Sequence, residues 1–212
     1  MSKTKIAVLV SGGGTNLQAL LDAEASGILH SGEIVLVVSN KPGAYALTRA
    51  EKAGVEGITL TRAACGGQEG FEAALNEALE SRGVELIILA GFLSILSAAF
   101  TQRWENRILN IHPSLIPSFC GKGFYGLKIH EAALARGVKY TGATVHYVNH
   151  IPDGGEILLQ KPVAVLPGDT PEVLQRRVME QAEWILLPKA IDGIANGTIP
   201  YGEAAYEKGA ES

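Results

Sequence analysis

Hydrophobic residues along the chain form short, nearly uninterrupted runs that alternate with stretches of helical spacing. Residues 5–10, 33–39 and 85–90 are apolar and rich in β-branched side chains, which is typical of strands buried on both faces of a sheet. Residues 56–60 form a weaker run of the same kind. The helices predicted between these runs begin at Leu17, span 44–53 and extend from Phe71 to Leu79. This alternation predicts a parallel sheet covered by helices on both faces.

The strands predicted for the second half of the chain are arranged differently. Residues 108–111 predict one more buried strand, which Pro113 ends because proline has no N–H to donate to a neighbouring strand. Strands over 140–149 and 156–165 are joined by a short turn at 151–155, so we expect them to pair antiparallel. The predicted fold is α/β and Rossmann-like: a mostly parallel sheet with helices on both faces and an antiparallel edge in the C-terminal half.

Two further helices are predicted in this half. One covers 129–136, and the last begins with Thr170 as N-cap and Pro171 at its first position. Pro188 is expected to bend or end that last helix. The polar tail after about residue 195 is expected to be frayed.

Length and charge limit the classes of function. At 212 residues the chain has the length of one α/β domain, and residues 1–212 are expected to form a single one. The net charge of -4 and the pI of about 5.8 argue against broad nucleic-acid binding, which needs a basic face, and favour a small-molecule partner. The sequence contains no run of 18 apolar residues, so no membrane span is predicted.

The first strand begins within a few residues of the N-terminus and leaves no room for a signal peptide, so a cytoplasmic location is expected. Cys65 and Cys120 are too few for a disulfide framework and fit a reducing compartment. The cysteine and histidine spacing of a zinc site is absent, and no metal is expected.

A glycine-rich turn follows the first strand. Gly12, Gly13 and Gly14 allow a tight backbone, and Thr15 and Asn16 then open a helix. A helix N-terminus in this position offers free N–H groups to an anion, most naturally a phosphate, although the glycines could also serve only a tight connection.

Two common nucleotide fingerprints are excluded at this turn. Leu17 stands where the dinucleotide fingerprint needs its third glycine, and Ser39 and Asn40 stand where it needs an acidic residue. No Gly-Lys-Ser/Thr sequence follows, which argues against a nucleoside triphosphate. A monophosphate remains the best interpretation.

Candidate catalytic groups leave the strand at 108–111. Asn110 and His112 are two residues apart, so they point to the same face, where an amide donor and a titratable base could serve acyl chemistry. A hydrogen-bonded structural pair is the alternative. His112 titrates near neutrality, and a nearby carboxylate would favour its protonated form.

Three other segments could border this centre. Leu93, Ile95 and Leu96 follow the strand at 85–90 and could line a slot for a flat heterocycle, although such a stripe is also typical of a core. Asp153 could supply a carboxylate or could merely make a turn before glycine. Residues 118–126 are glycine-rich and aromatic, and we expect a mobile loop beside the centre.

Four stretches together resemble the phosphoribosylglycinamide formyltransferase family of folate-dependent enzymes in purine synthesis, over nearly the whole chain. They are residues 11–18, 90–97, 109–117, and 144–148 with 153–155. The Asn-Ile-His segment alone marks the wider superfamily, which includes formyltetrahydrofolate deformylase and methionyl-tRNA formyltransferase.

The resemblance implies transfer of the formyl group of 10-formyltetrahydrofolate, as co-substrate, to the amine of glycinamide ribonucleotide, without a metal. It implies Asn110, His112 and Asp153 as the catalytic set and His146 as a supporting residue. The substrate-binding residues implied near the phosphate and ribose are Gly13, Gly14, Thr15, Asn16 and Glu183. The folate-binding residues implied are Gln68, Leu93, Ser94, Ile95, Leu96 and Asn110.

This chain departs from the family pattern in three places. Gln68 and Ser94 stand where relatives often carry arginine, which affects contacts to the acidic tail of the folate. The loop at 120–126 is longer than usual. The pair Glu183-Trp184 replaces a Glu-His pair, with one residue added upstream.

Rival functions remain open at this point. A deformylase would use water instead of the amine, and a non-catalytic module would bind only the nucleotide. Cys120 could act as a nucleophile with His112. Of the remaining histidines, His30 is expected at the surface and His130 at the start of a helix, with no role assigned to either.

Overall fold

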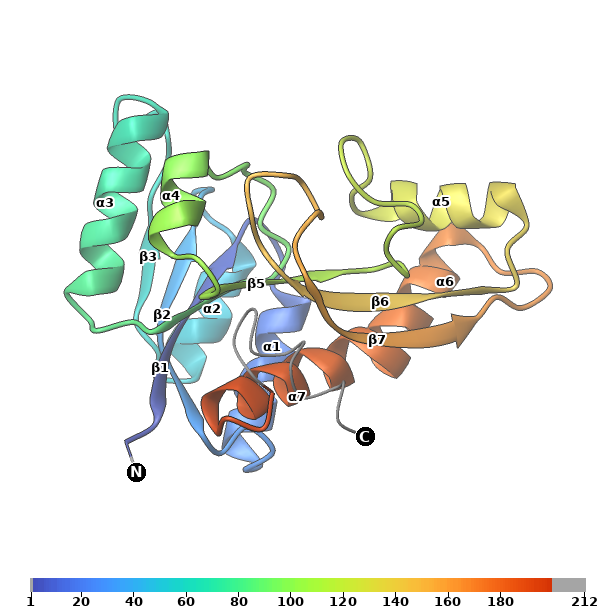
Figure 1. The fold of residues 1–212 in the computed structure, drawn as a ribbon, viewed down its shortest axis with the longest axis horizontal. Coiled ribbons are helices and arrows are strands. Elements are labelled where there is room, and N and C mark those ends of the chain that lie inside the picture. Colours follow the sequence, from blue (N-terminus) through green and yellow to red (C-terminus); the bar gives the residue numbers. More distant parts are fainter. Residues whose placement is uncertain (1, 200–212) are drawn as a thin grey trace, which may run out of the picture.

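A seven-stranded sheet is the centre of the computed structural model, which describes residues 2–199 (Figure 1). Its strands are β1 (Thr4–Val10), β2 (Gly32–Ser39), β3 (Gly57–Thr59), β4 (Leu86–Leu89), β5 (Ile108–His112), β6 (Tyr140–Tyr147) and β7 (Ile157–Ala164). Their order in the sheet is β3-β2-β1-β4-β5-β6-β7. The strands β1 to β5 are parallel, and β6 pairs antiparallel with both β5 and β7. The predicted fold class is confirmed, including the antiparallel edge.

The helices are α1 (Thr15–Ala25), α2 (Tyr45–Lys52), α3 (Gln68–Glu80), α4 (Ala98–Arg103), α5 (Leu127–Arg136), α6 (Pro171–Val178) and α7 (Trp184–Ala195). A π-helical turn, Met179–Glu183, joins α6 to α7. The sequence did not predict α4, which has six residues and begins where the Ser97 hydroxyl accepts the N–H of Phe100 at 3.1 Å. The helix α3 begins at Gln68, before the start at Phe71 that the sequence predicted.

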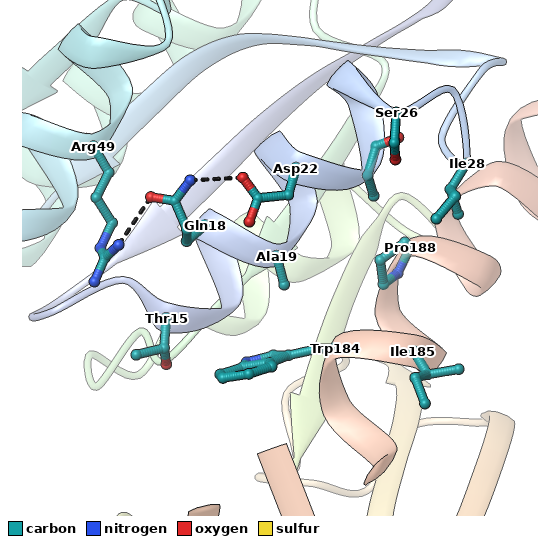
Figure 2. A pocket seen from close by; sticks show the side chains of 11 residues that line it. Thr15, Gln18, Ala19, Asp22, Ser26, Ile28, Arg49, Trp184, Ile185 and Pro188 are labelled. Carbon is teal, nitrogen blue, oxygen red and sulfur yellow. Dashed lines mark hydrogen bonds between the residues drawn. The ribbon is translucent and has the colours of Figure 1, made fainter. Parts of the chain in front are cut away.

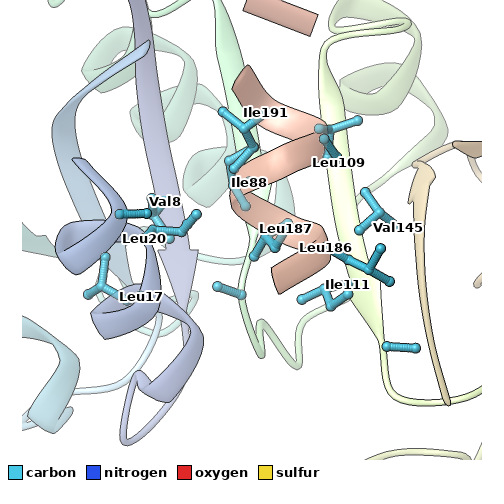
Figure 3. Packing of buried hydrophobic residues seen from close by; sticks show 14 of the residues in the cluster. Val8, Leu17, Leu20, Ile88, Leu109, Ile111, Val145, Leu186, Leu187 and Ile191 are labelled. Atoms are coloured by element: carbon cyan, nitrogen blue, oxygen red, sulfur yellow. The ribbon is translucent and has the colours of Figure 1, made fainter. Parts of the chain in front are cut away.

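Two apolar clusters cover the two faces of the sheet. The helices α3 and α4 enclose the first cluster, which contains Phe71 and Phe100. The second cluster lies under α1 and α7, and Figure 3 shows Leu187 and Ile191 packed among strand residues such as Leu109. Fully burying one such side chain contributes about 1.5–3 kcal/mol. Together the clusters hold the carboxyl ends of the strands in fixed positions.

The helix α7 continues through Pro188 to Ala195, so of the two expected effects of this proline, a bend or an end, the end is wrong. A proline inside a helix costs about 3 kcal/mol. That cost is smaller than the gain from Leu187, Ala190 and Ile191 on the buried face, because each is almost inaccessible to solvent.

The predicted frayed tail lies mostly outside the described residues, which end at position 199. Within them, the N–H of Ile199 donates to the carbonyl of Gly193 at 2.8 Å and holds the chain against α7. No helix among residues 2–199 is both long and apolar enough to cross a membrane.

We expect Leu187→Ala to lower the free energy of unfolding by about 2–5 kcal/mol, because the deletion leaves a cavity in the cluster under α7. Urea unfolding measures this as a lower midpoint with an unchanged m-value. The control is Ile185→Ala on the same helix, which should cost less than about 1 kcal/mol because Ile185 is 47% exposed. Equal costs for the two variants would contradict the packing described here.

Candidate active site

A cavity of about 380 Å³ opens at the carboxyl ends of β1, β4 and β5. The chain turns to opposite sides of the sheet after β1 and after β4, and ligands of open α/β sheets bind at such a reversal. The cavity is lined by the glycine turn after β1, residues 90–93 after β4, residues 110–113 at the end of β5, and by Asp153 and Glu183. The turn after β1, the segment after β4 and the end of β5 therefore meet at this cavity.

The pairing of β5 with β6 sets the centre of the site. Asn110 and His112 line the cavity from the same face of β5, as predicted. His146 stands opposite Asn110 in the antiparallel pair, and its Nε2 lies 3.1 Å from Asn110 Nδ2. The other nitrogen, Nδ1, lies 2.7 Å from the carbonyl oxygen of Tyr147 and donates to it, so Nε2 accepts from the Asn110 amide.

The His112 ring is buried and fixed on two sides. Nε2 donates to the carbonyl of Phe119 at 2.9 Å, and Nδ1 lies 3.5 Å from Asp153 Oδ2. Burial lowers the pKa of His112 below its ordinary value near 6.5, and this outweighs the carboxylate of Asp153 and the carbonyl of Phe119, which favour the charged form. Asp153 thus favours the charged form of His112 as expected, but burial has the larger effect and favours the neutral ring in the free protein near neutral pH.

The Asp153 carboxylate faces this ring and is not turned to solvent. Its side chain is 15% exposed, and its backbone adopts a left-handed φ of 54° in the turn between β6 and β7. The N–H of Gly121 donates to Oδ2 at 2.8 Å. Burial favours the protonated acid, but His146, His112 and the Gly121 N–H together lower the pKa of Asp153 below its ordinary value. A carboxylate thus lies beside a neutral imidazole.

The loop at 118–126 supplies two of these contacts. Phe119, which accepts from His112, has a left-handed φ of 52°, an uncommon conformation for a residue with a side chain. Gly121 binds Asp153 from the same loop. The loop was expected beside the centre, and its backbone orients both catalytic candidates.

The glycine turn forms the opposite wall. Gly14 has a φ of 71° and caps α1, and a Cβ at this position would lie 2.6 Å from Ala46 Cβ, so only glycine fits. The Ser11 hydroxyl accepts the N–H of Leu93 at 2.8 Å and joins this turn to the segment after β4. The first N–H groups of α1 have no partner within the helix, and residues 12–16, which open this helix, line the cavity.

Glu183 closes the cavity from the π-helical turn. Its side chain is buried, and Oε2 accepts from Asn16 Nδ2 at 2.6 Å. Burial raises the pKa of Glu183 to about 7, against the opposing effect of Asn16. A π-helical turn holds one more residue than an α-helical turn, and this one lies directly upstream of Trp184, where the family resemblance implied an added residue.

A second, smaller cavity of about 140 Å³ meets the first at Asn110 and Asp153. It is lined by the predicted slot residues Ser94, Ile95 and Leu96, and by His146 and residues 148–152. Leu93 lines the larger cavity instead.

Gln68 lines neither cavity. Its Nε2 donates to the carbonyl of Ile95 at 3.3 Å, at the rim of the slot. Arg62, which the sequence interpretation did not select, donates to the same carbonyl at 2.7 Å. The slot therefore has one guanidinium at its rim.

Several lining residues were missed from sequence, namely His130, Gln175 and Met179, whereas residues 124–126 belong to the loop that was predicted beside the centre. His130 was placed correctly near the start of a helix, but no sequence pattern indicated that this helix faces the cavity. Cys120 is not among the lining residues; burial and Asp153 raise the pKa of its thiol, which argues against a nucleophile.

The larger hollow of about 580 Å³ between α1 and α7 lies outside this centre (Figure 2). Its polar side chains already pair with one another: Arg49 donates to Gln18 at 2.8 Å, and Gln18 donates to Asp22 at 2.9 Å. Among residues 2–199, no three His, Cys, Asp or Glu side chains are grouped to hold a metal ion.

Known proteins match almost all of this chain. The family described as formyl transferase matches residues 4–191. The trifunctional purine biosynthetic protein adenosine-3 of Gallus gallus is 45% identical over 203 residues, which are 96% of this chain and 20% of that protein. The phosphoribosylglycinamide formyltransferase of Haemophilus influenzae is 40% identical over 195 residues, which are 92% of this chain and 89% of that protein.

The fold agrees with these matches. Glycinamide ribonucleotide transformylase 1 from Symbiobacterium toebii has a TM-score of 0.85 and 43% identity, with 92% of this chain and 89% of that one covered. This chain spans about a fifth of the Gallus protein but nearly all of the Haemophilus enzyme. It belongs to the formyl transferase family, among the phosphoribosylglycinamide formyltransferases.

Proposed function

We propose that this protein transfers the formyl group of 10-formyltetrahydrofolate to the amine of N1-(5-phosphoribosyl)glycinamide, a step of purine synthesis. The observation that carries the proposal is the meeting of two cavities at Asn110 and Asp153. One cavity has a helix N-terminus suited to a phosphate, and the other is a small slot suited to a pterin. The amine and the formyl group would meet where the cavities join.

The cavity of about 380 Å³ is where we place the formyl acceptor, the ribosylglycinamide, called the acceptor below. We assign its phosphate to Gly13, Gly14, Thr15 and Asn16, because the N–H groups at the start of α1 are unpaired within the helix. We assign its ribose hydroxyls to Glu183, whose buried carboxyl faces the same cavity.

Binding of the folate follows from the slot. Ser94, Ile95 and Leu96 would border the pterin, with Leu93 at the junction of the cavities. Gln68 and Arg62 lie at the rim, where Arg62 supplies the positive charge that an acidic tail would meet.

The chemistry requires one proton to move between two nitrogens. The amine attacks the formyl carbon, a C–N bond forms, and the oxygen gains negative charge that the Asn110 amide stabilises as a donor. Neutral His112 can accept the proton that the amine loses, and Asp153 stabilises the resulting imidazolium. The proton then passes to the folate nitrogen, directly or through a water, as the bond from that nitrogen to the formyl carbon breaks.

We expect Asn110→Ala, His112→Ala and Asp153→Asn each to lower turnover about 100- to 1,000-fold, as the loss of an oxyanion donor or proton carrier typically does. The measurement is tetrahydrofolate release by absorbance, with thermal melting to confirm the fold. Near-normal turnover in His112→Ala would remove the mechanism.

Cys120→Ser is the matched control for these variants, because it changes the neighbouring loop without removing a group that lines the cavity. Its turnover should stay within about twofold of the unmodified protein, since within residues 2–199 the thiol hydrogen bonds only to the Pro117 carbonyl, at 3.2 Å. A large loss would instead support a nucleophilic thiol.

The same assay without acceptor tests the deformylase alternative. Tetrahydrofolate release should require the ribosylglycinamide. Its phosphate binds at the start of α1 and this binding positions its amine for attack, whereas a water molecule has no phosphate to hold it in position. Release at the same rate without acceptor would favour hydrolysis and contradict the proposed transfer.

Glu183→Gln should weaken binding of the ribosylglycinamide substrate, and the size of this effect should depend on pH. The pKa of Glu183 near 7 means that the carboxylate, a stronger acceptor of ribose hydroxyls than the acid, forms as pH rises from 6 to 8. The ratio of acceptor KM in the variant to that in the unmodified protein should therefore rise across this range. The ratio cancels titration of the substrate itself, and a constant ratio would contradict a ribose contact through this carboxylate.

A further inference from the structure

His130 is a buried titratable residue that the mechanism above does not use. It is the fourth residue of α5, it is 0% exposed, and it lines the acceptor cavity together with residues 124–126 and Ile129. Neither of its ring nitrogens has a hydrogen-bond partner in the part of the chain that the structure describes.

The other buried histidines are fully engaged. His112 contacts Phe119 and Asp153, and His146 contacts Asn110 and the Tyr147 carbonyl. Buried polar groups nearly always have partners, because leaving them unpaired is costly. An unpaired buried imidazole at the wall of a binding cavity therefore indicates a partner that binds there.

The charge state of His130 limits what that partner can be. Burial, together with the nearby His112, lowers its pKa to about 4, so the ring is neutral near pH 7. A neutral imidazole has one N–H donor and one acceptor nitrogen. It suits an uncharged polar group and is a poor proton carrier at neutral pH.

The position of His130 near the N-terminus of α5 favours a hydrogen-bond acceptor atom as the ligand group that it contacts. The first turn of α5 has no side-chain cap and no acidic residue, so its N–H groups and positive dipole end remain open. A carbonyl oxygen of the ligand would receive the imidazole N–H in this positive field.

The polar groups of the acceptor can be assigned one by one, which rests on the function proposed above. The phosphate goes to the glycine turn, the ribose hydroxyls to Glu183, and the amine to the junction at Asn110 and Asp153. The amide that links the ribose to the amine is left without a partner. We infer that His130 binds the carbonyl of this amide and so positions the amine for attack.

The test compares unmodified protein with His130→Phe by calorimetry. The ligands are a carbocyclic glycinamide ribonucleotide and its analogue in which the carbonyl is a methylene group. His130→Phe should lower the affinity for the carbonyl ligand about three- to tenfold, which is the usual contribution of one hydrogen bond. It should leave the affinity for the methylene analogue unchanged. His130→Gln, which keeps a donor and an acceptor, should recover part of the loss.

Two further readouts separate positioning from a structural role. Removing an unpaired buried polar group should raise the melting temperature of His130→Phe by about 2–4 °C, whereas loss of a structural contact would lower it. The pH profile of kcat should keep its shape, and affinity for a folate analogue should not change. His30→Phe, before the start of β2 and 64% exposed, is the control that should leave both ligand affinities and the pH profile of kcat unchanged; because it removes the contact of His30 with Asp192 at 3.1 Å, it should not raise the melting temperature.

Equal affinity of both proteins for the carbonyl ligand, or an equal loss with the methylene analogue, would overturn the inference. So would a lower melting temperature in both His130 variants. Failure of the proposed function is a separate result: the unmodified protein would then release no tetrahydrofolate in the presence of acceptor, whatever the calorimetry shows.

Discussion

The antiparallel pairing of β5 with β6 is the constraint on which the site depends. It places His146 opposite Asn110 and directs the chain after β6 into the turn that carries Asp153. A shift of one residue in this register would turn Asn110 and His112 to the other face of the sheet. The register is held because Leu109 and Ile111, which alternate with them, are buried in the cluster under α7. Core packing thus fixes the positions of the polar groups.

Burial then decides which of these groups carry charge. It keeps the imidazoles of His112 and His130 neutral and leaves Glu183 near its midpoint at pH 7, whereas the pKa of Asp153 is lowered because the two neighbouring histidines and the Gly121 N–H favour its carboxylate. In the free site, the ionised carboxylate of Asp153 therefore lies beside the neutral imidazole of His112. That arrangement suits a reaction in which the incoming amine brings the proton, because the imidazolium forms only once there is charge on the substrate to balance it.

The sequence predicts some parts of this site well and others poorly, for physical reasons. The common face of Asn110 and His112 follows from the two-residue period of a strand, and the left-handed cap at Gly14 follows from the glycine turn. The approach of Asp153 to His112 depends on how a distant hairpin folds back, which no local period encodes. The position of His130 beside the cavity could not be predicted for the same reason, because the periodicity of a helix does not indicate which cavity its end will face.

The π-helical turn shows how two demands on one helix are reconciled. An added residue in an α-helix rotates everything after it by about 100°. Without compensation, either Glu183 would leave the cavity or the buried face of α7, which includes Leu187 and Ile191, would leave the core. At this turn the N–H of Trp184 reaches the carbonyl of Met179, five residues earlier, so the extra residue is contained before α7 begins. Both the carboxyl and the apolar face therefore keep their places, and Trp184 is the residue left to line the outer hollow.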